Sequence, residues 1–341
     1  MAFVTTLRGK GIFSMTVQFN KKTRSRGIEW TDHTINVFGG CFHRCRWQMP
    51  DGTIAQCYAE SLAENGVAKA GYPHGFEHHY YRPSNLKSLV AGRDPKLIFM
   101  DSMSDLFGHW VDDDQLTAVL KAMANAPHHA YQSLTKAPGR ITKYMHLFPN
   151  NLWVGVSSPP DYFMPAQTAV ADFNGTGMKP ATPMPHHAKV KMLQRALTAL
   201  AEVKAATGNI TWMSWEPVSW DMAPHIDAEL MPDWVIIGAA SNGRAYFQPD
   251  PAHIVPLLNL ADEAGTAVFY KGNIKPMFAA NDLGSDRLNR WREDFPATYR
   301  DGSTIPAVAR RQELCREYGW TVNEFVAEQP LQVSFFDSIG S

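Results

Sequence analysis

The chain is short of cysteine, of net charge and of long apolar runs. It has four cysteines in 341 residues, too few for a secreted disulfide framework. Its 32 basic and 33 acidic side chains give a net charge of −1, which argues against a protein that coats nucleic acid non-specifically. No apolar run approaches the roughly 20 residues that a membrane-spanning helix needs. Because residues 1–10 are also too short and polar for a signal peptide, we expect a cytoplasmic protein without a membrane span.

What the chain does contain is an alternation of short apolar runs and helical periodicity. Apolar residues make up 45% of the sequence, enough to bury a sizeable core. Near-continuous apolar runs are typical of strands that are buried on both faces of a parallel sheet. The expected strands are Thr34–Phe38, Leu97–Met100, Tyr131–Leu134, Leu152–Val156, Ile210–Trp215, Trp234–Ile237 and Ala267–Tyr270. The clearest expected helices are Asp112–Ala126, Ala188–Thr207, 251–264 and Ala309–Tyr318.

This alternation predicts an α/β fold, a partial or complete (β/α) barrel of six to seven parallel strands. A doubly wound open sheet is the alternative, although no G-x-G-x-x-G turn follows the first strand. We expect one barrel domain at 28–275, preceded by a basic extension at 1–27 and followed by a helical or irregular extension at 276–341. Residues 159–187 form a long insertion rich in Pro, Met, Gly and His.

Three of the four cysteines lie in one loop directly after the first expected strand. They are Cys41, Cys45 and Cys57. Three thiolates without a fourth leave one iron of a cubane iron–sulfur cluster open to a further ligand. The alternatives are three structural cysteines, or a zinc site that His43 or His74 completes. The remaining Cys315 is interpreted as an ordinary buried thiol.

The order of a strand, G-C-x-x-x-C and C-Y-A resembles the radical S-adenosylmethionine (SAM) superfamily, in particular its spore-photoproduct-lyase-like branch. It is also similar to a phage- and prophage-borne family that mostly lacks an assigned function. The segments that carry the resemblance are I-E-W-T-D at 28–32, C-Y-A-E at 57–60, D-S-M-S-D-L-F at 101–107, S-L-T-K at 133–136, W-V-G-V-S at 153–157, S-W-E-P at 214–217, D-W-V-I-I-G at 233–238 and V-F-Y-K at 268–271.

The cysteine loop departs from the superfamily pattern C-x-x-x-C-x-x-C, which has an aromatic residue before the last cysteine. Here eleven residues separate Cys45 from Cys57, and Gln56 takes the aromatic position. We expect the loop to turn outward at the turn-forming residues 49–52 and so to bring Cys57 back.

The resemblance implies a [4Fe–4S] cluster on the three loop cysteines, with SAM as the source of a 5′-deoxyadenosyl radical. It places the SAM contacts at Asp101, Ser102, Ser104, Ser157, Ser158, Glu216 and Asn242, with Arg244 beside them. Lys136 and Lys271 would bind the SAM carboxylate or a substrate phosphate, and Glu216 and Lys271 would be catalytic. From the residues alone, helix caps, loop hydrogen bonds, a structural salt bridge and solvated rim lysines remain equally open.

Basic and aromatic residues outside the strand ends are candidates for nucleic-acid binding. They are Lys21, Lys22, Arg24, Arg26, Tyr80 and Tyr81. A solvated surface is the alternative. By analogy with phages that decorate thymidines, the resemblance implies an isomerase or lyase that acts on a hypermodified thymidine in phage DNA. A flavodoxin or ferredoxin would donate the electron, in the host cytoplasm. A peptide or small-metabolite substrate, or a non-catalytic zinc-binding interaction protein, are the other hypotheses.

Overall fold

The computed structural model describes residues 16–18, 28–48, 54–66, 68–159, 163–164, 184–241, 246–318 and 332–334. Its centre is one eight-stranded sheet with the order β1-β2-β7-β8-β9-β11-β12-β15. The edge strand β1 (Thr16–Gln18) runs antiparallel to β2 (His33–Ile35), and the remaining pairs are parallel. The other parallel strands are β7 (Leu97–Met100), β8 (Ala130–Thr135), β9 (Leu152–Ser157), β11 (Thr211–Trp215), β12 (Trp234–Ile237) and β15 (Ala267–Tyr270).

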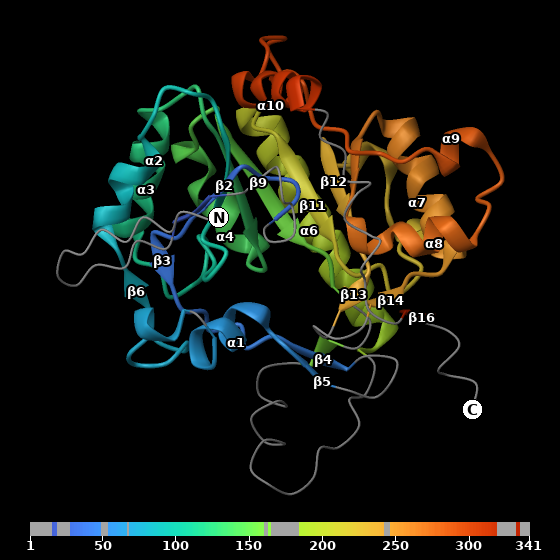
Figure 1. Ribbon diagram of the computed structural model, residues 1–341, viewed down its shortest axis with the longest axis horizontal. Coiled ribbons are helices and arrows are strands. Elements are labelled where there is room, and N and C mark those ends of the chain that lie inside the picture. The colour runs from blue at the N-terminus through green and yellow to red at the C-terminus, as the bar shows by residue number, and fades with distance from the viewer. Residues whose placement is uncertain are drawn as a thin grey trace, which may run out of the picture.

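The parallel strands follow one another in sequence order and form a curled half-barrel with helices on its outer face (Figure 1). Within the described residues, β15 pairs only with β12 and β1 only with β2, so the half-barrel stays open between its two edge strands, β15 and β1. The predicted partial barrel is therefore confirmed, and the doubly wound sheet is wrong. The helices are α1 (Tyr58–Glu64), α2 (Leu86–Leu89), α3 (Asp113–Ala124), α4 (Pro138–Tyr144), α6 (His186–Thr207), α7 (Pro251–Ala264), α8 (Lys275–Ala280), α9 (Asp286–Asn289) and α10 (Pro306–Tyr318).

Shorter elements decorate this frame. Two-residue strands β3 (Phe38–Gly39) and β6 (Tyr80–Tyr81) pair with each other. Two further small sheets contain β4 (Arg46–Gln48), β5 (Ile54–Gln56) and β10 (Phe163–Met164), and β13 (Ala240–Ser241), β14 (Tyr246–Gln248) and β16 (Gln332–Ser334). The 3₁₀ turns are η1 (Lys69–Gly71), η2 (Pro83–Asn85), η3 (Met145–Leu147), η4 (Ala223–His225), η5 (Ala228–Leu230) and η6 (Gly272–Ile274). No helix in the described ranges is both long and apolar enough to cross a membrane.

The predicted helix ends follow from local chemistry. Gly208 and Gly265 end α6 and α7 with φ of 73° and 67°, a left-handed conformation that glycine adopts without steric cost. The Asp250 side chain accepts the Ala252 N–H at 2.8 Å and caps α7. The internal Pro256 is tolerated within α7. One prediction fails: Cys315 in α10 is only partly buried.

The two faces of the sheet bury different side chains, because successive strand residues point in opposite directions. The outer face packs Met213 and Trp215 against Leu193 and Leu197 of α6. Aromatic rings fill the inner face. Trp153, Trp212 and Trp234 lie in the amino-terminal half of their strands, and Phe99 and Phe269 lie one residue before the ends of theirs.

The amino end of the open half-barrel is closed by two segments that are distant in sequence. Trp30 inserts among the inner rings, 4.7 Å from Phe99 and 5.2 Å from Trp212 between ring centroids. Arg311 of α10 holds this segment through Asp32, at 3.1 Å, and through the Glu29 carbonyl. Figure 1 shows α10 at one end of the sheet, and α1 with the β4–β5 hairpin at the other.

Candidate functional site

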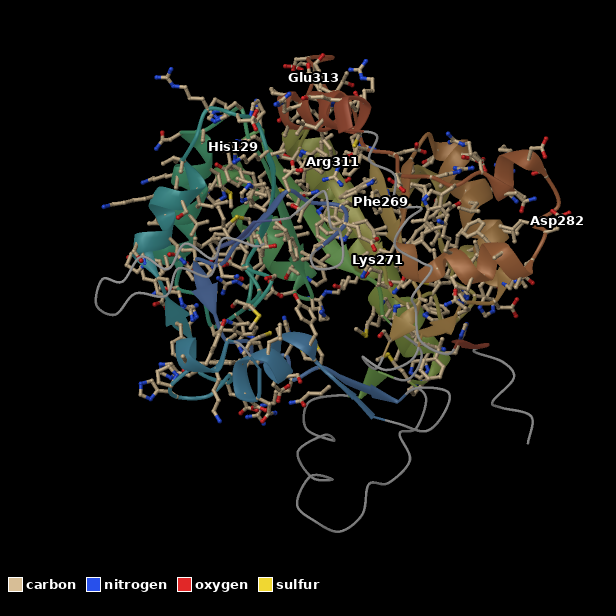
Figure 2. The ribbon with its side chains drawn as sticks, viewed as in Figure 1. His129, Phe269, Lys271, Asp282, Arg311 and Glu313 are labelled. Atoms are coloured by element: carbon tan, nitrogen blue, oxygen red, sulfur yellow. The ribbon has the colours of Figure 1, made fainter. Side chains whose placement is uncertain are left out.

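The polar residues predicted at strand ends share the inner face of the half-barrel. Residues two and four positions after Trp153 and Trp212 lie on the same face as these indoles. They are Gly155, Ser157, Ser214 and Glu216. Register aligns Ser157 with Ser214, and β15 adds Lys271 two residues after Phe269. On β9 and β11, indoles therefore occupy the amino half of the inner face, whereas small and polar residues line the carboxyl half. Figure 2 shows Lys271 on the side of Phe269 away from Arg311 and Glu313.

The cysteine loop folds against this carboxyl end. Gly40 precedes Cys41 with a φ of 80°, and a Cβ there would lie 1.8 Å from the His78 carbonyl oxygen, so only glycine fits. The Cys41 N–H then donates to the Phe76 carbonyl at 3.0 Å. This fixes the first cysteine at the end of β3.

The eleven residues between the second and third cysteines form a hairpin. Strands β4 and β5 pair antiparallel, with Arg46 opposite Gln56 and Gln48 opposite Ile54. The turn between them, at 49–53, lies outside the described residues. At the base of the hairpin, the Cys57 N–H donates to the Cys45 carbonyl at 3.2 Å. The prediction that this interval loops out and returns Cys57 is confirmed.

Lys136 shows that the three thiols share one environment. Cys45, and then Cys57 and Cys41, raise the pKa of the Lys136 ammonium, although burial acts in the opposite direction. Lys136 follows β8 and remains exposed to solvent. Burial raises the pKa of the Cys41 thiol, and the hydrogen bond from the His43 backbone N–H opposes this rise. Lys136 is thus the cation that faces all three cysteines.

A single metal ion does not suit this arrangement. Across the described ranges, no group of three or more His, Cys, Asp or Glu side chains could hold one ion. A zinc site needs all its ligands about 2.0–2.3 Å from one centre. A cubane cluster spreads its cysteines over separate irons, so thiols around a shared space fit a cluster better than the zinc alternative.

Tyr58, directly after the third cysteine, links the cysteine loop to the residues after β7. Its hydroxyl donates to the Ser102 carbonyl at 2.6 Å. Burial raises the pKa of Tyr58, and the nearby Cys57 and Glu216 raise it further. The residue nevertheless keeps 55% of its surface exposed.

The residues after β7 bind the cysteine loop. Asp101 has a φ of 52°, and its Oδ1 accepts the Phe38 N–H at 2.8 Å. Ser104 Oγ donates to the Gly40 carbonyl at 2.6 Å, and Ser102 Oγ lies 3.3 Å from Asn36 Oδ1. These three side chains therefore bond to residues 36–40 and do not cap the next helix, α3. A positive φ in a residue other than glycine is a strain that proteins retain mainly at functional sites.

Glu216 and Lys271 meet on the inner face at the far side of the site. Lys271 Nζ donates to Glu216 Oε2 at 3.2 Å, while buried Glu216 Oε1 has no hydrogen-bond partner in the described part of the chain. Gly238 leaves room for both: a Cβ there would lie 3.1 Å from Glu216 and 3.2 Å from Lys271. The structural salt bridge exists, and it leaves one carboxylate oxygen available to a ligand.

Glu29 approaches the same pair and was not expected in the site. Its Oε2 accepts the Gly272 N–H at 2.8 Å. Burial raises the pKa of Glu29, and Lys271 opposes this rise. The only signal in the sequence was its place in the I-E-W-T-D segment.

The other predicted site residues divide into three groups. Ser157 ends β9 half-buried, and the buried Ser158 Oγ has no partner among the described side chains. Tyr80 and Tyr81 are half-buried: Tyr80 Oη accepts the His74 N–H at 2.8 Å, and Tyr81 packs on Phe38. Lys21, Lys22, Arg24, Arg26, Asn242 and Arg244 lie outside the described residues.

Two surface clefts lie away from these residues. Their volumes are about 720 and 560 Å³, and both are lined by Gly208, Tyr299 and Arg300. Arg300 donates from there to the carbonyls of Lys204 and Ala205 at the end of α6. They contain none of the predicted site residues.

Comparisons with known proteins give few relatives. The model of a family described as "Protein of unknown function (DUF5131)" matches residues 25–164. No curated protein matches. Three solved structures of spore photoproduct lyase are similar at low level. A complex with dinucleoside spore photoproduct is 10% identical, has a TM-score of 0.36 and covers 91% of this chain and 78% of that chain.

The second structure is a cysteine-to-serine mutant, which is 9% identical with a TM-score of 0.38 and covers 94% of this chain and 79% of that chain. The third is a double mutant with bound AdoMet and dinucleoside spore photoproduct, which is 9% identical with a TM-score of 0.35 and covers 90% and 77%. All three TM-scores are below 0.5, so the half-barrel rests on its own strand order.

Proposed function

We propose that this protein is a radical SAM enzyme that binds a [4Fe–4S] cluster through Cys41, Cys45 and Cys57. The observation that carries the proposal is that the three cysteines lie together beside a parallel half-barrel: Cys41 and Cys57 pack against the same buried cluster, and the Cys57 N–H donates to the Cys45 carbonyl. Three cysteines leave one iron open to the amino and carboxylate groups of SAM. Glu216 Oε1 and Ser158 Oγ, which have no hydrogen-bond partner among the residues that the structure describes, are further polar atoms that a bound cofactor could satisfy.

When bound, the cluster and SAM supply one-electron cleavage of the sulfonium to a 5′-deoxyadenosyl radical. The protein's own residues hold and shield the reactants. Lys136 offers an ammonium to a carboxylate, and Glu216 Oε1 accepts a hydrogen bond from a ribose or substrate hydroxyl. Lys271 orients Glu216 by donating a hydrogen bond to its Oε2.

For the substrate we propose a nucleobase-linked group, in particular a hypermodified thymidine in phage DNA, that an isomerase or lyase reaction rearranges. This rests on the resemblance in the cysteine loop and the strand-end segments. Asn242 is proposed as a cofactor contact. Lys21, Lys22, Arg24, Arg26, Tyr80 and Tyr81 are proposed as DNA contacts, and a flavodoxin or ferredoxin is the proposed electron donor.

Cluster assembly tests the class of enzyme. After anaerobic reconstitution, about four iron and four sulfide per chain are expected, a stoichiometry that follows from the cluster type. Cys41→Ala, Cys45→Ala and Cys57→Ala should each lose the iron–sulfur absorbance, and the matched control Cys315→Ala should keep it. One zinc without sulfide in the wild type would overturn the proposal.

Nucleoside mass spectrometry tests the substrate. The reconstituted enzyme is incubated anaerobically with SAM and dithionite, with and without phage DNA that contains modified thymidines. A DNA-dependent change in the modified nucleoside, together with 5′-deoxyadenosine, is the expected result. Deoxyadenosine formation with unchanged DNA would point to a peptide or small-metabolite substrate.

A further inference from the structure

Asp105 joins the cysteine loop to the end of β8 through four hydrogen bonds. Its Oδ2 accepts from His43 Nε2 at 2.7 Å, from Thr135 Oγ1 at 2.9 Å and from the Lys136 N–H at 3.0 Å. Its Oδ1 accepts the Phe107 N–H at 2.9 Å. Asp105 is 3% exposed, so these bonds are screened little by water.

The carboxylate fixes the role of the His43 ring. Burial alone would raise the pKa of Asp105, but the bonds from His43, Lys136 and Thr135 lower it, so the group is ionised and accepts only. His43 Nε2 therefore carries the hydrogen in this contact. The ring also packs edge-on against Trp110, with 5.1 Å between centroids, which restricts its rotation.

The backbone of His43, as distinct from its ring, contacts Cys41. Its backbone N–H hydrogen-bonds the Cys41 sulfur. The following residue, Arg44, has a φ of 48°, so the backbone here is held in an uncommon conformation. The His43 N–H stays on the Cys41 sulfur only if the His43 peptide is held in place. The bond between the His43 imidazole and Asp105 holds it.

We propose that His43 is a positioning residue: the Asp105 carboxylate holds its imidazole, and its backbone N–H is thereby kept on the Cys41 sulfur. The inference rests on the proposed cluster site. Hydrogen bonds to cysteine sulfurs help to set the reduction potential of an iron–sulfur cluster. An N–H withdraws electron density from sulfur and favours the reduced cluster. The Asp105–His43 contact would therefore make the potential less negative than that of a loosely held loop.

The test compares His43→Leu with His43→Gln in the full chain. Leucine removes the bond to Asp105, whereas the glutamine amide can still donate to it. The exposed His146 in η3 provides the control His146→Leu. Iron and sulfide content, electron paramagnetic resonance g-values and the midpoint potential are measured after reconstitution.

We expect a more negative potential and altered g-values in His43→Leu, restoration toward the wild type in His43→Gln, and no change in His146→Leu. Loss of the cluster from His43→Leu with retention in His43→Gln would also support the positioning role. A wild-type potential in His43→Leu, or equal effects of leucine and glutamine, would overturn it. Absence of a cluster from the wild type would instead overturn the proposed function, so the two failures are distinguishable.

Discussion

At the scale of single residues, the two carboxylate oxygens of Glu216 differ: one is bound by a side chain, and the other is left as a free acceptor among the described residues. Its Oε2 is held by Lys271, and its buried Oε1 has no described partner. An ion pair of this exposure contributes about 0–1 kcal/mol to stability. A ligand bond to a charged group is worth more, about 1.5–3 kcal/mol. We therefore expect Glu216 to matter more for binding than for folding.

Glu216→Gln is expected to keep the cluster and the fold while it lowers SAM cleavage or product yield by roughly 10- to 100-fold, the equivalent of one charged hydrogen bond. Iron content, a thermal melt and 5′-deoxyadenosine yield are measured together. Glu263→Gln, at an exposed position of α7, is the matched control. Loss of the fold with no separate loss of activity would make the ion pair purely structural.

Asp101 gives a prediction of pH dependence. Burial raises the pKa of Asp101 to about 7, while the Phe38 and Val37 backbone bonds lower it. In the unfolded chain the value is about 3.9. The folded state thus favours the protonated carboxyl, whose stabilising contribution is complete below about pH 4 and is lost as the pH rises through 7.

Asp101→Asn keeps an acceptor for the Phe38 N–H, tolerates a positive φ and cannot ionise. Its free energy of unfolding should rise relative to wild type by on the order of 3 kcal/mol between pH 4 and pH 8. Urea titrations across this range measure the difference. The exposed Asp221→Asn should follow the wild type, and a constant offset for Asp101→Asn would refute the linkage.

At the scale of elements, the sequence was sufficient wherever local patterning decides the outcome. Six of the seven expected strands and the main helices lie where apolar runs, glycines and Pro251 indicate, because burial and capping act over a few residues. The expected strand Thr34–Phe38 is instead divided: β2 ends at Ile35, and Phe38 begins β3 of another sheet. Asp105 was missed because three of its four bonds depend on tertiary contacts, as far as 62 residues along the chain. Glu29 was missed for the same reason, since its partner Gly272 is 243 residues away.

Helix α7 allows a test of capping at the element scale. The Asp250 side chain accepts the Ala252 N–H, whereas Asp112, at the corresponding position before α3, makes no side-chain cap bond. Asp250→Ala should cost about 1 kcal/mol of unfolding free energy, and Asp112→Ala only a few tenths. Denaturant unfolding of the two variants and the wild type measures these losses of unfolding free energy. Equal losses in the two variants would contradict the assignment of Asp250 as the cap of α7.

At the scale of the whole molecule, DNA binding should depend steeply on salt, because each phosphate contact by a basic side chain releases counterions. Reversing the charge of Lys21, Lys22, Arg24 and Arg26 together should reduce DNA affinity and the salt slope. SAM cleavage without substrate should not change. A salt-dependent titration of the quadruple variant beside wild type tests this, and identical slopes would exclude the segment as a DNA contact.

The closure of the half-barrel by Trp30 and Arg311 has a consequence for biosynthesis. Arg311 contacts residues that precede it by 279 and 282 positions. At about 5–20 residues per second, the ribosome takes roughly 15 to 60 s to make the intervening chain. Until α10 has been made, the inner indoles lack the helix that packs against them. The floor of the barrel is therefore completed only after α10 has been translated, and a nascent chain that stalls before α10 presents its tryptophans to chaperones and proteases.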